Sequence, residues 1–216
     1  MSMRALICLA GELGDVSADE LGTLDTVIAA DSGIRHARQL GLEVDYVVGD
    51  FDSARPDDIS TARIHGAKLM QVSSEKDLTD FEIAIAQATN IGATELTVVA
   101  GWGGRLDHCV GNLAALAAPA HSHLQRHFRA EHEWVSVLDD AAIEIKGRPG
   151  DVVSLFPFGG QVAAVTTTGL KYPLSSQPMS PYAALGVSNE LLGSGATVAA
   201  TGGALLVVHP RRCKYL

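Results

Sequence analysis

The stretch ELTVVAGWGGRLDHCVGNLAALAA, residues 95–118, carries the pattern that decides the fold. It begins with an apolar run, Glu95–Ala100, passes through a turn rich in glycine, Gly101–Gly104, and continues as an apolar, helix-like stretch, Leu106–Ala118. A short apolar run is typical of a buried strand, and apolar residues at helical spacing are typical of a helix. The stretch therefore predicts a strand, a tight turn and a helix in succession.

The same alternation recurs toward the N-terminus. Further helices are predicted at Ser32–Leu40 and Leu78–Ile91, the second with Leu78, Phe81, Ile85 and Ala88 on one stripe. Strands that are apolar throughout are buried on both faces, so we expect an α/β fold: a mostly parallel, Rossmann-like sheet with helices on both faces. The other predicted strands are Arg4–Leu9, Thr26–Ala30, Tyr46–Val48, Lys68–Val72 and Trp134–Leu138.

After about residue 139 the sequence pattern changes to short β runs separated by Gly, Pro, Ser and Asn, and no segment has a convincing helical pattern. This pattern is typical of a small all-β sandwich. We therefore expect two domains, an α/β domain at residues 1–139 and a β-sandwich at residues 140–216. The β runs are Ala142–Ile145, Val152–Phe156, Val162–Thr167, Thr197–Ala200 and Leu205–Val208.

Composition excludes several classes of protein. The chain has 216 residues, 47% of them hydrophobic, and 16 Lys and Arg against 25 Asp and Glu give a net charge of −9. Such a chain can bury a core, but it is a poor partner for nucleic acid or an anionic membrane. The three cysteines form no CxxC pair, and there is no signal-like or membrane-spanning run. We therefore expect a cytoplasmic location.

The excess negative charge is concentrated near the N-terminus: residues 1–60 hold 12 acids and 4 bases. Two of these acids, Asp50 and Asp52, follow an apolar strand directly. In an extended chain they would point the same way, and paired carboxylates suit Mg²⁺. The alternative is a solvated turn, because Gly, Asp and Ser favour turns.

Two other acidic segments follow predicted strands. Asp77 and Asp80 lie at the start of the Leu78–Ile91 helix, where Asp77 can serve as N-cap and Asp80 can favour the helix N-terminus. Asp31 opens the Ser32–Leu40 helix, and capping is the favoured interpretation there. Because ligands collect at the carboxyl ends of parallel strands, these carboxylates could instead meet those of Asp50 and Asp52.

The glycine-rich turn is a candidate phosphate-binding loop. Gly103 and Gly104 allow close approach of the backbone, the following helix presents free N–H groups, and Arg105 adds a fork of donors. The turn matches neither GxGxxG, since residue 106 is Leu, nor a P-loop. A histidine cluster forms a weaker candidate, for which solvent exposure is the favoured interpretation: His121, His123, His127 and His132.

Six motifs in order along residues 31–190 resemble the thiamine pyrophosphokinase (thiamine diphosphokinase) family. They are Asp31-Ser32-Gly33, Gly49-Asp50-Phe51-Asp52-Ser53, Lys76-Asp77-Leu78-Thr79-Asp80-Phe81-Glu82, Gly103-Gly104-Arg105-Leu106-Asp107-His108, Thr168-Gly169-Leu170-Lys171-Tyr172-Pro173-Leu174 and Gly186-Val187-Ser188-Asn189-Glu190.

This resemblance implies an enzyme that transfers a pyrophosphoryl group from ATP to the hydroxyethyl oxygen of thiamine, giving thiamine diphosphate and AMP. It implies Mg²⁺ as cofactor, an ATP- and metal-binding first domain, a thiamine-binding second domain, and a homodimer with active sites between subunits. The runner-up functions are a pyrophosphokinase for another small alcohol, such as a hydroxymethylpterin, and a non-catalytic nucleotide or thiamine sensor.

The resemblance also implies roles for individual residues. Asp50, Asp52 and Asp77 would hold Mg²⁺, Asp80 and Asp107 would complete the acidic cluster, and either Asp77 or Asp107 would accept the proton of the attacking hydroxyl. Tyr172, Ser188 and Asn189 would line the thiamine site. The nucleotide-binding residues would be Asp31, Ser32, Gly33, Lys76, Thr79, Gly103, Gly104 and Arg105.

The chain departs from the family pattern after Asp31. Ser32 stands where the family usually has the first of two glycines, and the continuation Ile34-Arg35-His36 departs from the common Ala-Asn. We expect these departures to alter how this loop contacts the nucleotide.

Overall fold

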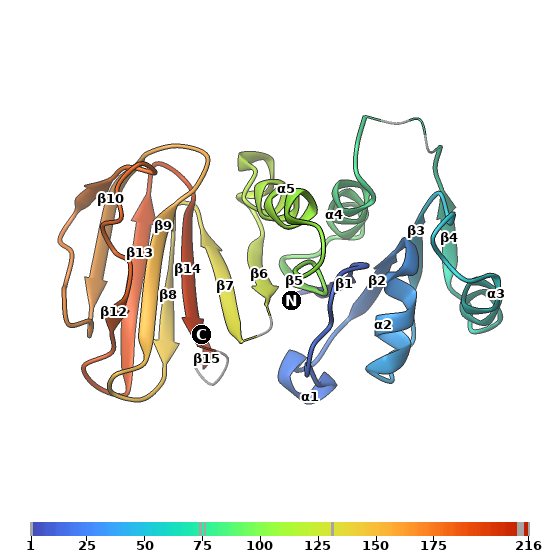
Figure 1. The fold of residues 1–216 in the computed structure, drawn as a ribbon, viewed down its shortest axis with the longest axis horizontal. Coiled ribbons are helices and arrows are strands. Elements are labelled where there is room, and N and C mark those ends of the chain that lie inside the picture. The colour runs from blue at the N-terminus through green and yellow to red at the C-terminus, as the bar shows by residue number, and fades with distance from the viewer. Residues whose placement is uncertain (1, 74, 76, 131, 211–213, 216) are drawn as a thin grey trace. The chain divides into compact units, whose positions relative to one another are not determined.

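The computed structural model describes residues 2–73, 75, 77–130, 132–210 and 214–215. The chain divides into two compact units, the first made of Met1–Ala115 with Phe128–Glu131, the second of Leu116–His127 with His132–Leu216 (Figure 1). The predicted functional boundary between residues 139 and 140 stays a prediction. Every helix in the described part of the chain is too short or too polar to span a lipid bilayer.

A parallel sheet forms the centre of the first unit. Its strands pair in the order β4-β3-β2-β1-β5, and every pair is parallel. The central strands are almost wholly buried, as their continuous apolar sequence requires. The strands are β1 (Arg4–Cys8), β2 (Thr26–Ala30), β3 (Tyr46–Gly49), β4 (Lys68–Gln71) and β5 (Glu95–Val99), each within two residues of its predicted range.

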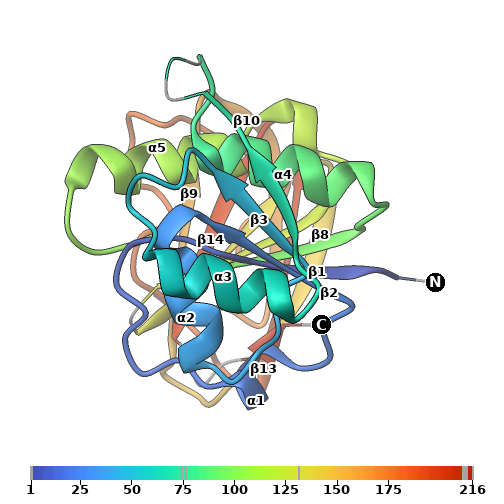
Figure 2. The same ribbon diagram turned by 90° about the vertical axis from the view of Figure 1, so that its right-hand side faces the viewer.

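Helices cover both faces of this sheet. In Figure 2, α2 (Ile34–Gln39) and α3 (Pro56–Ile64) lie on one side of the strands, and α4 (Asp80–Asn90) and α5 (Leu106–Leu116) lie on the other. A short helix, α1 (Ala18–Leu21), precedes β2, and a 3-10 turn, Asp31–Gly33, leads into α2. The prediction of helices on both faces is therefore correct. The helix predicted at Ser32–Leu40 consists of two segments, the 3-10 turn and α2.

The order of the strands reverses beside β1. Strands β2, β3 and β4 follow one another on one side of β1, whereas β5 lies on its other side. At such a reversal the connections leave the strands in opposite directions and open a crevice at their carboxyl ends. The topology therefore places a ligand crevice at the ends of β1 and β5.

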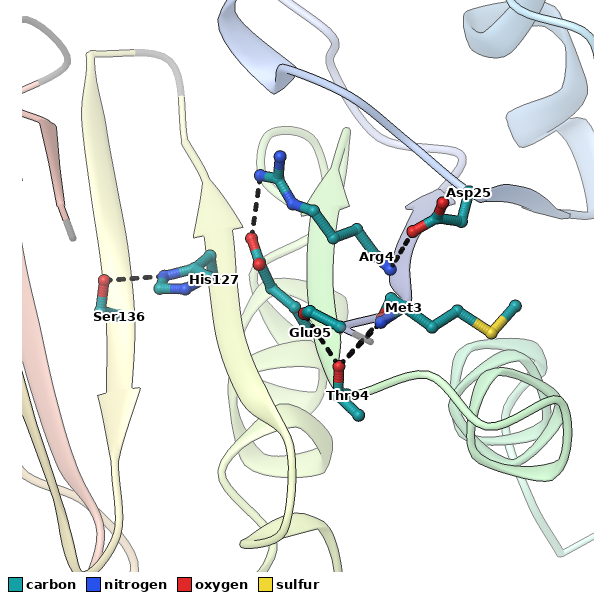
Figure 3. A network of polar contacts seen from close by, with 8 residues as sticks. Met3, Arg4, Asp25, Thr94, Glu95, His127 and Ser136 are labelled. Atoms are coloured by element: carbon teal, nitrogen blue, oxygen red, sulfur yellow. Dashed lines mark hydrogen bonds and ion pairs between the residues drawn. The ribbon is translucent and has the colours of Figure 1, made fainter.

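Polar contacts hold the opposite end of the same strands. The Arg4 guanidinium forms an ion pair with Glu95 at 2.9 Å, and the Arg4 amide donates to the Asp25 carboxylate at 2.8 Å (Figure 3). The Met3 amide donates to the Thr94 hydroxyl at 3.0 Å. These bonds join β1 to the segments that precede β2 and β5, so they support the register of the three strands.

The second unit consists mainly of antiparallel strands. One group pairs in the order β12-β9-β14-β7, and a five-stranded sheet has the order β11-β10-β13-β8-β15. One apolar cluster takes side chains from both groups, among them Val153 and Leu155 of β9 and Val165 of β10. The bounds are β7 (Glu133–Leu138), β8 (Ala141–Lys146), β9 (Val152–Pro157), β10 (Val162–Thr168), β11 (Gln177–Met179), β12 (Asn189–Glu190), β13 (Gly195–Thr201), β14 (Leu205–Pro210) and β15 (Lys214–Tyr215).

The start of α4 differs from the prediction. Thr79, not Asp77, is the N-cap: its hydroxyl accepts from the Glu82 amide at 3.2 Å, and the Glu82 carboxylate accepts from the Thr79 amide at 2.8 Å. This reciprocal pair is a capping box, which outcompetes an aspartate two residues earlier. Leu78 therefore precedes the helix and is 51% exposed, so it is not part of the buried stripe.

Besides short elements such as α1, β11, β12 and β15, two longer elements of the structure have no counterpart in the prediction. Helix α3 has a weak apolar periodicity, although Pro56 at its first turn is a regular start signal. Strand β6 (Gln125–Arg129) reads QRHFR, yet its last four residues are buried. The expectation of solvent exposure is wrong for His127, because its ring is buried and its Nδ1 lies 2.9 Å from the Ser136 hydroxyl.

The buried His209 of β14 predicts a loss of stability in acid. Burial lowers the pKa of His209 to about 4, so between pH 6.5 and 4 the unfolded chain binds a proton that the folded chain refuses. We expect the free energy of unfolding to fall by up to roughly 3 kcal/mol over this range. Denaturant unfolding of the wild type and of His209→Gln at several pH values measures this fall in the free energy of unfolding, which should be smaller in His209→Gln. The substitution of an exposed histidine, His123→Gln, serves as control. An identical pH profile for His209→Gln would contradict the prediction.

Candidate active site

Three carboxylates meet at the carboxyl ends of β2 and β3. Asp31 directly follows β2, and Asp50 and Asp52 follow β3; each offers an oxygen atom, and these atoms lie within 4.8 Å of one another. The two strands are neighbours in the sheet, so their ends bring together residues that are about twenty positions apart in sequence. The structure thus joins Asp31, predicted as a nucleotide contact, to the predicted metal ligands Asp50 and Asp52.

The backbone at this edge is shaped around the Asp31 side chain. Gly49 has a φ of 150°, and a Cβ atom there would overlap the Asp31 carboxylate. Asp31 and Phe51 themselves adopt positive φ values of 46° and 65°, which non-glycine residues adopt only rarely. The Phe51 amide donates to Asp31 Oδ1 at 3.1 Å. The chain therefore turns at Phe51 instead of staying extended, yet Asp50 and Asp52 remain together.

The charges at this edge act on one another. The pKa of Asp31 is raised to about 6, chiefly by burial and in addition by the neighbouring Asp80 and Asp50, while the Phe51 amide acts in the opposite direction. Like charges held this close favour either a proton or a cation between them. Carboxylate oxygens are the ligands that Mg²⁺ prefers, so this donor set fits the cofactor that the family resemblance implies.

The predicted residues at the start of α4 have different positions. Asp80 is half buried, and its proximity to Asp31 contributes to the raised pKa of the Asp31 carboxyl. Asp77 is exposed and does not belong to the group formed by Asp31, Asp50 and Asp52. Thr79 uses its amide and hydroxyl in the capping box of α4. Lys76 lies outside the described residues.

A pocket of about 330 Å³ opens at the ends of β1 and β5, where the strand order reverses. The glycine-rich turn forms one wall, and the segment after β1 forms another. Its lining residues are Ala10, Gly11, Glu12, Arg35, Ala100, Gly101, Gly103, Gly104, Arg105, His108 and Asn112.

Glycines let the two walls of this pocket approach each other. A Cβ atom at Gly11 would lie 2.6 Å from the Trp102 carbonyl oxygen, and Gly103, with a φ of 86°, sits against the Glu12 side chain. The Glu12 amide donates to the Trp102 carbonyl at 2.8 Å. Asn112 of α5 donates to the Gly101 carbonyl at 2.8 Å. These contacts build a cradle of backbone next to Arg105 and the start of α5.

Arg105 and Asp107 form an exposed pair at the rim of this pocket. Arg105 Nε donates to Asp107 Oδ1 at 3.1 Å, and Arg105 Nη2 contacts the other carboxylate oxygen. The hydrogen bond from Arg105 lowers the pKa of Asp107 to about 2. In the free chain Asp107 is therefore a weak proton acceptor.

In the second unit, Asn189 holds the chain at Tyr172. Asn189 is buried; its amide nitrogen donates to the Tyr172 carbonyl at 2.7 Å, and its oxygen accepts from the Tyr172 amide at 3.0 Å. Tyr172 itself remains 62% exposed. Ser188 is exposed, has a φ of 58°, and donates its amide to the Ser154 hydroxyl at 3.0 Å. Asn189 thus positions the exposed Tyr172 ring by way of the backbone.

Four residues with polar or charged side chains line the pocket in the first unit but were not predicted as site residues from the sequence: Glu12, Arg35, His108 and Asn112. Glu12 follows a strand, and His108 and Asn112 belong to the first turns of α5, so a systematic search of strand ends would have found these three. The signal at Arg35 is its departure from the family pattern, which by itself does not reveal a place in the pocket.

Comparison with known proteins agrees with this geometry. The model of "Thiamin pyrophosphokinase, catalytic domain" matches residues 19–127, and that of "Thiamin pyrophosphokinase, vitamin B1 binding domain" matches residues 141–205. The chain belongs to the thiamine pyrophosphokinase family. The predicted resemblance is therefore confirmed, as is the predicted enzyme class, a thiamine diphosphokinase.

Individual relatives of the family match most of the chain. Thiamine pyrophosphokinase of Bacillus subtilis (strain 168) is 25% identical over 211 residues, which cover 96% of this chain and 99% of the relative. A crystal structure of thiamin pyrophosphokinase from Geobacillus thermodenitrificans is 26% identical with a TM-score of 0.78, covering 96% and 97% of the two chains. The crystal structure of the B. subtilis protein, at 24% identity, shares the fold with a TM-score of 0.80 over 96% and 98%.

The crowding of the carboxylates predicts that Asp31 destabilises the metal-free chain. Its pKa is higher in the folded chain than the ordinary 3.8, so the free energy of unfolding should decrease as the pH rises from about 4 to 6. Asp31→Asn keeps the oxygen that accepts from Phe51 but carries no charge. We expect it to melt above the wild type at pH 7.5 in EDTA, with the difference vanishing near pH 4.

The control for this experiment is Asp57→Asn, which removes an exposed carboxylate from the first turn of α3. Thermal melts of all three proteins should show Mg²⁺ raising the melting temperature of the wild type and of Asp57→Asn more than that of Asp31→Asn. A difference between wild type and Asp31→Asn that is independent of pH would contradict the assignment.

Proposed function

We propose that the chain uses Mg²⁺ and ATP to transfer a pyrophosphoryl group to the hydroxyethyl oxygen of thiamine, forming thiamine diphosphate and AMP. One observation carries the proposal: in a member of this family, the carboxylate group and the glycine-lined pocket occupy the same edge of one parallel sheet. The carboxylates follow β2 and β3, and the pocket lies at the ends of β1 and β5.

Asp50 and Asp52, with Asp31 beside them, are the residues that would hold Mg²⁺. Their oxygens already lie within 4.8 Å of one another. The pKa of Asp31 is raised chiefly by burial and in addition by neighbouring carboxylates, whose repulsion a cation would relieve. When bound, the metal ion neutralises the negative charge on the phosphate oxygens during transfer. Asp77 and Asp80 remain proposed members of the wider acidic cluster.

The pocket beside β1 and β5 is the proposed site of the nucleotide. Gly103 and Gly104 leave room for phosphate oxygens against the backbone, the N-terminus of α5 favours negative charge, and Arg105 donates to those oxygens. Ser32 and Gly33 contribute from the turn after β2. Because phosphoryl transfer depends mainly on positioning and charge, these residues bind and orient without covalent chemistry.

Asp77 is the proposed proton acceptor for the thiamine hydroxyl. The alternative, Asp107, is held in its charged form by Arg105, and its low pKa makes it a weak base. Asp77 is exposed at the carboxyl edge of the sheet, before α4.

We propose that the second unit is a β-sandwich that binds thiamine through Tyr172, Ser188 and Asn189. The apolar cluster shared by its two groups of strands supports the sandwich. The match of the vitamin B1 binding model to residues 141–205 supports the binding role and a functional boundary near residues 139 and 140. The exposed Tyr172 ring offers a face on which an aromatic ligand can stack. A cytoplasmic location remains part of the proposal.

We also propose a homodimer with active sites between subunits. Val152 and Phe156, which lie on one face of β9, are 45% and 39% exposed, and Leu185 and Val187 of the adjoining loop are 45% and 41% exposed. Large apolar side chains exposed on neighbouring segments are typical of a protein interface.

The decisive experiment measures AMP release from ATP with and without thiamine and Mg²⁺. We expect AMP and thiamine diphosphate in equal amounts, and only when ATP, thiamine and the divalent metal are all present. A higher kcat/KM with a hydroxymethylpterin would identify another alcohol as the acceptor. Binding of ATP and thiamine with no thiamine-dependent AMP under any divalent metal would identify a sensor.

Loss of one carboxylate at the metal site should abolish most turnover without unfolding the chain. Asp52 is exposed, so Asp52→Asn should retain the wild-type circular dichroism and, within a few degrees, the melting temperature. We expect kcat/KM to fall by at least the roughly 10–100-fold that loss of an outer-shell partner of a metal costs. Asp57→Asn is the matched control and should keep full turnover. Unchanged turnover in a folded Asp52→Asn protein would remove Asp52 from the site.

A charge on the apolar face of β9 should weaken the dimer. Because Phe156 is partly exposed on the separate chain, Phe156→Glu should fold, but it would bury a charge at the interface. We expect light scattering to give the mass of a dimer for the wild type and of a monomer for Phe156→Glu at the same concentration. The exposed Glu133→Gln serves as control. A wild-type monomer, or a Phe156→Glu dimer of equal stability, would contradict this interface.

A further inference from the structure

Arg35, the second residue of α2, lines the same pocket as Arg105. It stands where the family pattern commonly has Asn, so its guanidinium is a feature of this chain that the family does not explain. The residue is exposed, and it reaches the pocket from the side of β1, whereas Arg105 belongs to the turn after β5. Two guanidinium groups therefore border one pocket from two different elements.

Hydrogen bonds hold the Arg35 guanidinium in place. Its Nη2 donates to the carbonyl oxygen of Ala10, just after β1, at 3.1 Å, and its Nε donates to His36 Nε2 at 3.3 Å. Because Arg35 can only donate, His36 Nε2 must be the unprotonated nitrogen of the ring. His36 Nδ1 therefore carries the proton and donates to the Leu9 carbonyl at 2.8 Å.

His36 is suited to this orienting role. Its ring is 6% exposed, and burial together with the neighbouring Arg35 charge lowers its pKa, so the ring stays neutral and can accept from Arg35. The ring is fixed between the Leu9 carbonyl and the Arg35 Nε. A guanidinium that is already oriented loses less conformational entropy when it binds an anion.

The charges around the pocket leave Arg35 available for an anion. Arg105 is paired with Asp107, whereas both hydrogen-bond acceptors of Arg35 are neutral, and within the described part of the chain no carboxylate pairs with it. Among the described residues that line the pocket, Glu12 is the single carboxylate. The unused donors of Arg35 therefore meet a glycine-lined cavity at the N-terminus of α5, which favours negative charge.

We infer that Arg35 is a second phosphate-binding residue of the nucleotide pocket, opposite Arg105, and that His36 is the positioning residue that orients its guanidinium. The inference rests on the proposed function in assigning the phosphates to ATP, but the anion site itself stands on the pocket. A guanidinium is positively charged and can donate hydrogen bonds to two phosphate oxygens at once. The side-chain amide of asparagine is neutral, so it lacks the electrostatic attraction to phosphate.

The test is calorimetric binding of two probes, inorganic tripolyphosphate in EDTA and adenosine, to the full chain and to its variants. We expect Arg35→Ala to weaken tripolyphosphate binding by roughly 10- to 100-fold, the scale of a hydrogen bond to a charged group, and to leave adenosine binding unchanged. Arg35→Lys should give an intermediate loss, because it keeps the charge but not the fork. Arg38→Ala is the matched control. Arg38 is an exposed arginine of the same helix, and it forms an ion pair with Asp58 outside this pocket.

The role of His36 has its own readout. His36→Asn can still donate to the Leu9 carbonyl but offers Arg35 no ring nitrogen, so it should weaken tripolyphosphate binding less than Arg35→Ala does. In the double variant the loss should equal that of Arg35→Ala alone, since His36 acts only through Arg35. Additive losses would contradict the positioning role.

The outcomes separate this inference from the proposed function. If the wild type releases AMP in the presence of thiamine but folded Arg35→Ala binds tripolyphosphate as tightly as the wild type, Arg35 is not a phosphate ligand and the function stands. If Arg35→Ala loses tripolyphosphate but the wild type forms no thiamine diphosphate, the anion site stands and the function is wrong. Should Arg35→Ala not fold, Arg35→Gln replaces it in the same comparison, and its tripolyphosphate binding supports or overturns the inference in the same way.

Discussion

Repulsion among carboxylates at one edge of the sheet is the constraint on which the site depends. Asp31 occupies the space above Gly49 that a side chain would fill, and it is held there by the Phe51 amide at 3.1 Å. Asp50 and Asp52 complete the group, and burial, together with the charges of Asp80 and Asp50, raises the pKa of Asp31 to about 6. The unfavourable backbone angles and the like charges both cost stability in the metal-free chain, and a bound cation would relieve the repulsion among the charges.

The topology explains why the proposed nucleotide pocket lies on the same edge. The strand order reverses between β1 and β5, so the connections after these strands diverge and leave a crevice, which glycines keep open. The other edge is tied by the ion pair of Arg4 and Glu95. One end of the sheet is thus stabilised by paired charges, while the other carries clustered carboxylates and guanidinium donors that a metal ion and phosphates would satisfy.

The sequence predicts most of the first unit because its signals are local. Apolar runs predict the five parallel strands to within two residues, and the acidic and glycine-rich segments after them indicate Asp50, Asp52 and Arg105. What the sequence could not predict depends on distant contacts. The residues next to Asp31 in sequence do not indicate that its side chain packs against Gly49. The sequence of β6 is mostly polar, so it does not indicate that the strand is buried. The sequence Thr79-x-x-Glu82 matches a capping box, but Asp77 is also a favourable N-cap residue and was preferred in the prediction.

Anomalous diffraction from crystals grown with Mn²⁺ and a non-hydrolysable ATP analogue tests the central claim most directly. We expect a manganese peak coordinated by Asp50 and Asp52 beside Asp31, with the phosphates of the analogue running from that ion toward Gly103, Gly104 and Arg105. A manganese ion bound away from these carboxylates, or an analogue bound outside the pocket at the ends of β1 and β5, would contradict the claim.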